Sequence, residues 1–303
     1  DGKTLITDYA FTGGEIKSAE KPTATLQGAM LLGDPERLES QAVRLRIDAI
    51  ETAADPDPKT PVNENADVRL YRVFAQLGFG RDPTDAAFRP NKPPTGEWAP
   101  LCPGGGLAVA VPGSWNYQSG SEGDGAKASQ DNNVITFACA TSAIAKCVTM
   151  GYKPWKPVVD GKGGPAISVD ALHQACVRAV RADYCGDGDT MTQAGTQVNF
   201  YDRAGIQRDA SDWPLEAVWS PEGALCVNST RLTTAPGNPR TERPATAVLG
   251  YIKKHCAARL SDKPCDQAAL VGKGGILWTE VQASATSPAL APTPTTPLAK
   301  PRN

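Results

Sequence analysis

The sequence has little excess charge, few aromatic residues and no long apolar run, and these shortages exclude several classes of protein. Its 31 Lys and Arg residues nearly balance its 33 Asp and Glu residues, so it lacks the basic surface of a nucleic-acid-binding protein. The longest apolar run covers residues 107–111, whereas a membrane-spanning helix needs about 20 such residues. Apolar residues make up 40% of the chain, which is enough for a folded core.

The sequence also lacks the short motifs of several enzyme classes. It contains no Cys-x-x-Cys pair, no Gly-x-Ser-x-Gly elbow, no His-Glu-x-x-His helix and no papain-type cysteine signature. The two histidines are His173 and His255. Because His255 is adjacent to Cys256, their side chains diverge on a helix. Catalysis by a cysteine–histidine pair is therefore not expected.

Eight cysteines are the most informative feature that is present. Cysteines in this number, without the spacing of metal or redox motifs, are typical of exported proteins with disulfides. The chain also begins at Asp1 rather than Met, as a processed chain does. We therefore expect an exported protein, extracellular or periplasmic, in which the cysteines are paired. They are Cys102, Cys139, Cys147, Cys176, Cys185, Cys226, Cys256 and Cys265.

The spacing of the cysteines predicts mostly local disulfides. Two pairs share a separation of nine positions, and each begins late in a predicted helix, so each bond would fix a helix end to the following loop. Eight cysteines allow 105 connectivities, of which this is one alternative. The predicted bonds are Cys139–Cys147, Cys176–Cys185 and Cys256–Cys265, with Cys102–Cys226 joining the two halves.

Hydrophobic patterning predicts an α+β fold, with a β-rich N-terminal half and a disulfide-stapled C-terminal half that carries two or three short helices. Residues 43–49 alternate apolar and charged side chains, as half-buried strands do. Ser168 is suited to cap a helix over residues 168–182, which has one apolar face. Further strands are predicted at residues 68–74, 107–111, 134–138, 197–201, 216–219 and 224–227, and further helices at residues 142–150 and 245–260.

Composition divides the chain into three parts. Residues 1–40 are polar and rich in turn signals, which predicts an N-terminal arm. Residues 41–280 carry the patterns of a folded domain. Residues 281–303 are rich in Pro, Thr and Ala and predict a tail that buries no core. We expect the two terminal segments to contact protein partners or further copies of the chain.

Short motifs containing cysteine, glycine and aromatic residues follow one another along the central part. They include Trp98-Ala99-Pro100-Leu101-Cys102, Gly113-Ser114-Trp115, Phe137-Ala138-Cys139, Gly151-Tyr152-Lys153-Pro154-Trp155, His173-Gln174-Ala175-Cys176, Ala182-Asp183-Tyr184-Cys185, Tyr201-Asp202 and Gly223-Ala224-Leu225-Cys226. In this order they resemble the ADYC domain of bacterial secreted and lipoprotein-like proteins, over about residues 40–265. The resemblance implies export and a cysteine framework, and it indicates no reaction.

One part of this segment has ligands suited to zinc. His173 and Cys176 lie one helical turn apart, and Cys185 follows the helix, which supplies three of the four ligands of a zinc site. The alternative is that Cys176 forms a disulfide and His173 packs nearby, as exported cysteines usually pair. Candidates for the fourth ligand are Asp183, Asp187 and His255.

The acidic residues after this helix are suited to calcium. Asp183, Asp187 and Asp189 supply the hard oxygen atoms that calcium prefers. The segment departs from an EF-hand loop, because Val198 stands where that loop has a bidentate Glu. The alternative is a tight turn, in which Asp and Gly are common.

Two functions stay open from the sequence. The one we favour is an exported, non-enzymatic structural or binding module at the cell surface, such as a subunit of an extracellular assembly. The other is a secreted hydrolase, with or without a metal, that uses carboxylates as general acid and base if the fold gathers them. Its candidate residues are Asp183, Asp187, Asp202 and Glu216.

Overall fold

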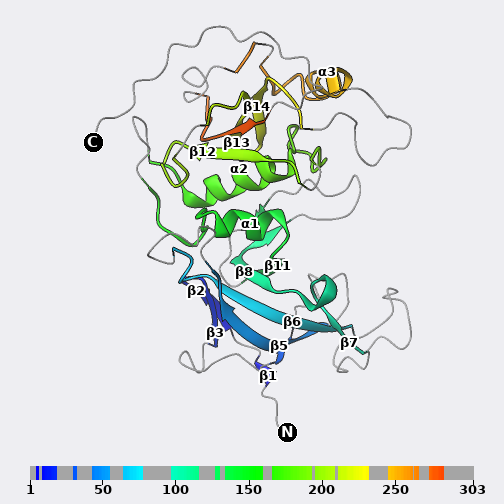
Figure 1. Ribbon diagram of the computed structural model, residues 1–303. Helices are drawn as coiled ribbons and strands as arrows, with labels where there is room; N and C mark the ends of the chain where they lie inside the picture. The colour runs from blue at the N-terminus through cyan, green and yellow to red at the C-terminus, as the bar shows by residue number, and fades with distance from the viewer. Residues whose placement is uncertain are drawn as a thin grey trace.

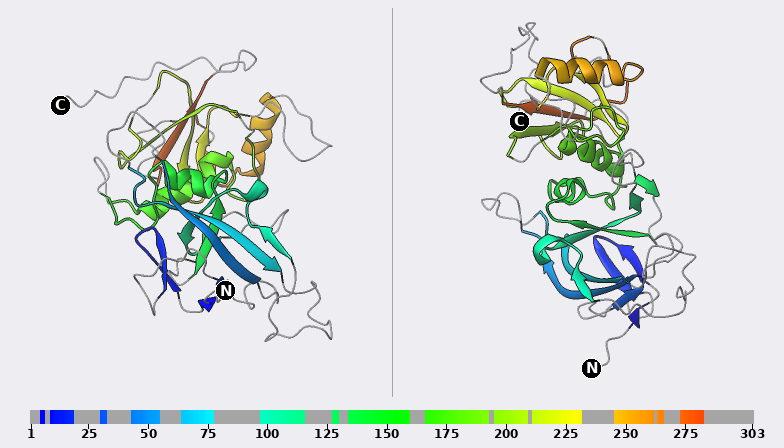
Figure 2. Two further views of the ribbon diagram at one scale, coloured as in Figure 1. Left: turned by 60° about the horizontal axis from the view of Figure 1, so that its bottom comes forward. Right: turned by 90° about the vertical axis from the view of Figure 1, so that its right-hand side faces the viewer.

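Two helices lie between two β-sheets in the computed structural model of the chain (Figure 1). The right-hand view of Figure 2 shows the first sheet at the bottom, the green helices above it and the second sheet above them. This arrangement confirms the predicted α+β fold. The structure describes residues 5–6, 9–18, 30–32, 43–54, 64–77, 97–115, 127–129, 134–159, 166–192, 195–208, 211–231, 245–261, 263–265 and 273–282.

The first sheet is built around one long antiparallel hairpin, β5 and β6, and has the strand order β1-β4-β5-β6-β8-β11 with β7 added to β6. Alternation along β5 places Ile47 in the core, while Arg46 and Asp48 face away and pair with each other. Four of these strands, β5, β6, β8 and β11, confirm the predictions for the first half. The strands are β1 (Leu5–Ile6), β4 (Met30–Leu32), β5 (Val43–Thr52), β6 (Arg69–Leu77), β7 (Trp98–Pro100), β8 (Ala108–Pro112) and β11 (Ile135–Cys139).

The N-terminal segment contributes to the core, which differs from the polar arm predicted for residues 1–40. Strands β2 (Tyr9–Thr12) and β3 (Glu15–Ser18) form a hairpin. Its Phe11 side chain is buried with an edge contact to Trp155, and Ile16 is buried beside the first sheet. Among the hairpin residues whose burial is described, the apolar side chains in the core are Phe11 and Ile16. Each strand has four residues, which is too short for alternation to identify it by pattern. The described part of this segment is therefore folded.

Helices α1 (Ala143–Thr149) and α2 (Val169–Arg181) form the middle layer. The caps follow the sequence pattern, because the side chain of Ser142 accepts the third N–H beyond it and Ser168 does the same for α2. Helix α2 is buried along most of its length, since α1 covers one side and the second sheet covers the other. Within the described part of the chain, no helix has the length and apolar character to cross a membrane.

The second sheet takes its central strand from near the end of the chain. Its order is β12-β15-β13-β14, and every neighbour is antiparallel. All five residues of β15 are buried, so residues up to Val281 belong to the same folded unit. Helix α3 ends at His255, five residues before the predicted end, because the chain turns at Cys256. The elements are β12 (Val198–Asp202), β13 (Leu215–Ser220), β14 (Gly223–Val227), α3 (Ala245–His255) and β15 (Leu277–Val281).

Smaller elements connect these layers. A short 3-10 turn, η1 (Pro103–Gly105), follows β7, and β9 (Ser114–Trp115) pairs with β10 (Lys127–Ser129). Residues 283–303, which contain most of the predicted tail, lie outside the described residues.

All eight cysteines form disulfides, as expected, but the predicted pairing is wrong at every bond. Cysteines that are close in sequence are not bonded to each other: Cys176 lies on the buried face of α2, whereas Cys185 lies in the loop beyond that helix. Each observed bond instead joins segments that are 29 to 71 positions apart, with Cα–Cα distances between 5.3 and 5.9 Å. The bonds are Cys102–Cys139, Cys147–Cys176, Cys185–Cys256 and Cys226–Cys265.

We predict that replacing both members of the Cys147–Cys176 bond by Ala lowers the free energy of unfolding by about 3–4 kcal/mol through loop entropy. An additional loss is expected because both sulfur atoms are fully buried between the helices. Urea unfolding measures the change. The matched control removes Cys226–Cys265, whose loop of 39 residues against 29 changes the entropic part by only about 0.3 kcal/mol. An unchanged unfolding midpoint in the first variant would contradict the structural role of this bond.

Candidate functional site

Four of the predicted site residues, Asp183, Cys185, Asp187 and Asp189, follow the C-terminus of α2, where Ala182, Asp183, Tyr184 and Cys185 stand in sequence. Ala182 adopts a left-handed conformation, with φ of 51°, and ends the helix. Ala182 and Tyr184 are buried, and Asp183 is fully buried. The polar groups of this loop are therefore removed from water and require partners within the protein.

Asp183 organises the loop that follows it. Its carboxylate forms an ion pair with Arg178 of α2, whose side chain is also buried. The same carboxylate accepts the backbone N–H groups of Asp187 and Gly188, at 3.2 and 3.1 Å. The carboxylate thus pairs with a cation of α2 and caps the turn that follows it, which agrees with the turn alternative to a calcium site. Sequence reasoning missed Arg178, which has no motif around it.

Tyr184 joins the loop to the second sheet through a buried charged pair. Its hydroxyl donates to Glu216 at 2.6 Å, and its ring stacks on Trp219 with centroids 5.3 Å apart. Arg231 donates to both oxygens of Glu216 at 2.8 Å, and both side chains are almost completely buried. Burial raises the pKa of Tyr184 well above its ordinary value, and the negative charge of Glu216 raises it further.

Arg231 is the second cation that sequence reasoning missed. Burial alone would lower its pKa, but the charge of Glu216 outweighs burial and raises it. It follows Glu216 by 15 positions and lies outside any helix or strand, and no sequence periodicity connects the two. Glu216 is thus neutralised by a group that only the folded chain brings to it.

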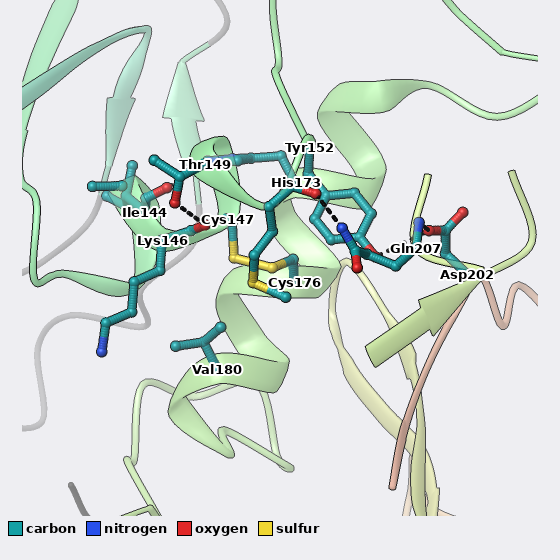
Figure 3. Close-up of a disulfide and its surroundings, with 12 residues drawn as sticks. Ile144, Lys146, Cys147, Thr149, Tyr152, His173, Cys176, Val180, Asp202 and Gln207 are labelled. Carbon is teal, nitrogen blue, oxygen red and sulfur yellow. Dashed lines mark hydrogen bonds between the residues drawn. A yellow bond between two sulfur atoms is a disulfide. The ribbon is translucent and has the colours of Figure 1, made fainter. Parts of the chain in front are cut away.

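His173 lies within α2, about 12 Å along the helix axis from the last helical residue, Arg181, at about 1.5 Å per residue. Its Nε2 atom is 3.1 Å from the carbonyl oxygen of Ile144 in α1, and its ring has an edge contact with Trp115. Cys176, expected beside it as a zinc ligand, is instead bonded to Cys147, as Figure 3 shows. The packed-histidine alternative therefore describes this position.

Asp202 closes a turn at the end of β12 and is separate from the loop after α2. Its carboxylate accepts the backbone N–H groups of Gly205, Ile206 and Gln207, at 2.7, 3.2 and 2.6 Å. It also accepts the hydroxyl of the fully buried Tyr152 at 3.0 Å (Figure 3). Burial raises the pKa of Tyr152 well above its ordinary value, and the adjacent carboxylate adds to this effect.

The four carboxylates proposed for a hydrolase therefore each have a different principal partner. Asp187 is the exposed member, and its Oδ2 atom lies 3.0 Å from Nε2 of His255. Asp189 is exposed too, and its backbone N–H donates to Asp187. The partners are Arg178 for Asp183, His255 for Asp187, Tyr152 for Asp202, and Arg231 with Tyr184 for Glu216.

Among the described residues, one group of at least three metal-ligating side chains gathers, with ligand atoms within 4.8 Å of one another. It consists of Cys185, Asp187 and His255. Of the metal ligands favoured from the sequence, it includes Asp187 and excludes His173, Asp183 and Asp189. Cys185 is bonded to Cys256, and a sulfur atom in a disulfide is not the thiolate that binds zinc.

A further set of polar contacts connects the first sheet to the segment after α1. The amide of Asn65 donates to the carbonyl oxygen of Thr149 at 3.1 Å. Asp67 forms ion pairs with Lys153 at 2.5 Å and with Lys156 at 2.8 Å. Burial alone would raise the pKa of Asp67, but hydrogen bonds from the two lysines outweigh it and lower the pKa to about 2.

Comparison with protein families decides the classification. The family model described as the ADYC domain matches residues 23–233, more than two thirds of the chain. The chain belongs to the ADYC domain family. No curated protein and no solved structure matches it. The ADYC match contains the loop after α2, Glu216 and Arg231, whereas α3 and β15 lie beyond its end.

We predict that Glu216→Gln destabilises the ADYC domain by about 3–5 kcal/mol, because it leaves the charge of Arg231 buried without a counter-charge. Chemical unfolding of the oxidised protein at neutral pH measures this loss. The control is Glu222→Gln, which alters an exposed carboxylate two residues beyond β13 and should change stability by no more than about 0.5 kcal/mol. Equal losses of unfolding free energy in the two variants would contradict the predicted contribution of the Glu216–Arg231 pair.

We also predict that Asp67 contributes stability that depends on pH. Its pKa is about 2 in the folded protein, against an ordinary value of 3.8, so the contribution is complete above about pH 4 and declines as the pH falls towards 2. The stability difference between the wild type and Asp67→Asn should therefore narrow over that interval. Unfolding experiments at a series of pH values measure it, with Asp212→Asn at an exposed position as the control. A difference that stays constant down to pH 2 would contradict the assignment.

Proposed function

We propose that this ADYC domain protein is an exported, non-enzymatic structural or binding module of the cell surface. The observation that supports this most strongly is the use of its chemically versatile side chains as internal connections. Asp183 ties the loop to α2, Tyr184 ties it to β13, and Cys185 ties it to the end of α3. Such connections produce a rigid surface for contact with other molecules.

Export is supported by the cysteines. Four disulfides form and persist in oxidising compartments such as the periplasm and the extracellular space, and they are rare in the cytosol. They lie at the first sheet (Cys102–Cys139), between the two middle helices (Cys147–Cys176), and between the segment after α3 and both the loop after α2 (Cys185–Cys256) and strand β14 (Cys226–Cys265). Covalent cross-links of this kind stabilise the folded chain.

The same geometry makes the hydrolase the weaker proposal. A pair of catalytic carboxylates lies about 5–10 Å apart and faces a shared substrate. Here Asp183 and Glu216 are fully buried, and each is ion-paired to its own arginine. A general acid or base must reach the substrate with its carboxyl group, and burial keeps both of these groups away from the solvent-exposed surface. Asp187 is exposed, and its side-chain partner is His255 rather than another carboxylate.

Partners are the remaining element of the proposal. We infer that the module binds other proteins or further copies of itself. The N-terminal hairpin is packed into the core through Phe11 and Ile16, which leaves the folded surface and the C-terminal tail for these contacts. The tail lies outside the described residues, so its part in binding rests on its composition.

We predict that unreduced protein from its natural host is recovered outside the cytoplasm with a mass about 8 Da below the all-thiol value, since four bonds remove eight hydrogens. Native mass spectrometry over a concentration series is expected to show multimers or a co-purified protein. A variant that ends at residue 282 tests whether the tail carries these contacts. Recovery from the cytoplasm with free thiols would contradict export. A strictly monomeric species without a partner at every concentration would contradict the assembly role.

A further inference from the structure

The end of α3 meets the loop after α2 at a cluster of three side chains that bind soft and borderline metals. Ligand atoms of Cys185, Asp187 and His255 lie within 4.8 Å of one another. Cys256, bonded to Cys185, supplies a second sulfur atom next to this cluster. Cys256 is buried, whereas Asp187 and His255 are exposed and Cys185 is half-buried, so a metal ion and a small reductant can approach from the side of Cys185.

We propose that these four residues form a zinc site when the Cys185–Cys256 disulfide is reduced. Zn²⁺ binds four ligands in a tetrahedron and prefers thiolate sulfur and imidazole nitrogen, with carboxylate oxygen as a further ligand. Two cysteines, one histidine and one aspartate supply such a set. The disulfide and the zinc complex are alternatives, because each uses both sulfur atoms.

The exchange balances in electrons and protons. A thiol or dithiol reductant supplies two electrons and two protons, which break the sulfur–sulfur bond and give two thiols, while the reductant becomes a disulfide. Zinc binding then displaces both thiol protons, whereas His255 binds as the neutral ring and Asp187 as the carboxylate. The complex carries one net negative charge. The guanidinium group of Arg259 donates to the carbonyl oxygen of Cys185 at 2.9 Å and provides a cation beside it.

The loop keeps its shape without the disulfide because other bonds hold it. Asp183 accepts the backbone N–H of Asp187, and Arg178 holds Asp183 in turn. The backbone N–H of Ala224 donates to the carbonyl oxygen of Tyr184 at 2.9 Å, which fixes the loop to β14. The ligands on this side are therefore positioned before any metal binds.

The α3 side of the cluster is positioned in a similar way. Val248 and Ile252 are fully buried and anchor the helix to the core. The ring of Tyr251 stacks on that of His255, with centroids 5.2 Å apart. His255 already faces Asp187 at 3.0 Å, so a zinc ion bound to both would take the place of their direct contact.

The buried disulfide on α2 provides a useful contrast. His173 lies one turn before Cys176, as a zinc motif would require. Its Nε2 atom, however, is directed to the carbonyl oxygen of Ile144, and both the ring and the Cys147–Cys176 bond are fully buried. Among the described residues, the combination of an accessible disulfide with adjacent imidazole and carboxylate ligands is found at Cys185–Cys256.

The test uses the full chain under anaerobic conditions with Co²⁺ as a spectroscopic substitute for Zn²⁺. The protein is treated with a graded phosphine reductant, and differential alkylation followed by mass spectrometry identifies which cysteines are free. We expect Cys185 and Cys256 to be freed, and the reduced protein to bind one Co²⁺ per chain with thiolate charge-transfer absorption and tetrahedral visible bands. The oxidised protein should show neither signal.

Variants separate this site from binding to other thiols. His255→Ala and Asp187→Asn should each weaken metal binding by about tenfold or more, because losing even a residue that supports a ligand typically costs that much. Both variants retain the disulfide and can be purified in the folded, oxidised form. The matched control is Asp189→Asn, an exposed residue of the same loop, which should bind as the wild type does.

A double variant decides the outcome. Cys185→Ser with Cys256→Ser retains the other six cysteines, and after reduction it should give no thiolate–cobalt absorption. If it binds Co²⁺ as the wild type does, the metal is held by other thiols and the proposal is wrong. Failure of the reduced wild type to bind, or binding that is unchanged in His255→Ala and Asp187→Asn, would overturn it equally.

Discussion

The burial of α2 on both sides is the constraint on which the rest of the structure depends. Helix ends and the loops that follow them normally reach the surface, where water satisfies their backbone groups. Helix α2 lies between α1 and the second sheet, and the first residues after it, Ala182, Asp183 and Tyr184, are inside the protein. The residues that follow must therefore satisfy one another. Ala182 turns the chain, Asp183 accepts two backbone N–H groups, and Tyr184 reaches Glu216.

This requirement explains the sequence Ala-Asp-Tyr-Cys in physical terms. Ala182 is small, so it fits the buried left-handed position where a larger side chain would clash with its surroundings. The side chain of Asp183 is short enough for its carboxylate to accept N–H groups from its own loop while it pairs with Arg178. A tyrosine combines a ring that stacks on Trp219 with a hydroxyl that donates to Glu216. The cysteine then fixes the loop covalently to the end of α3. The motif is the means by which a buried helix ends.

Local features of the fold could be predicted from the sequence, whereas contacts between distant segments could not. The serine caps and the apolar face of α2 identify both middle helices, because these signals lie within one helix. Strand β15 escapes prediction, since its five buried residues occupy the centre of a sheet and carry no alternation. The disulfide pairing fails for a related reason. Which cysteine Cys176 meets depends on how α1 packs against α2, and proximity in sequence says nothing about that.

The candidate site follows the same division. The acidic sequence after α2 predicts Asp183 and Asp187 as site residues, but Arg178 and Arg231, which form ion pairs with the buried acids, have no sequence signature. Internal pairing of these acids leaves Asp187 and His255 exposed beside the Cys185–Cys256 disulfide, which joins the loop to the end of α3. The loop itself is held by Asp183 and by the hydrogen bond to β14. Reduction of the Cys185–Cys256 disulfide therefore releases two sulfur atoms, while the hydrogen bonds and ion pair of Asp183 still hold the loop in place. A fold whose polar interior is satisfied without a particular disulfide can use that disulfide for chemistry, and here the buried ion pairs provide this independence.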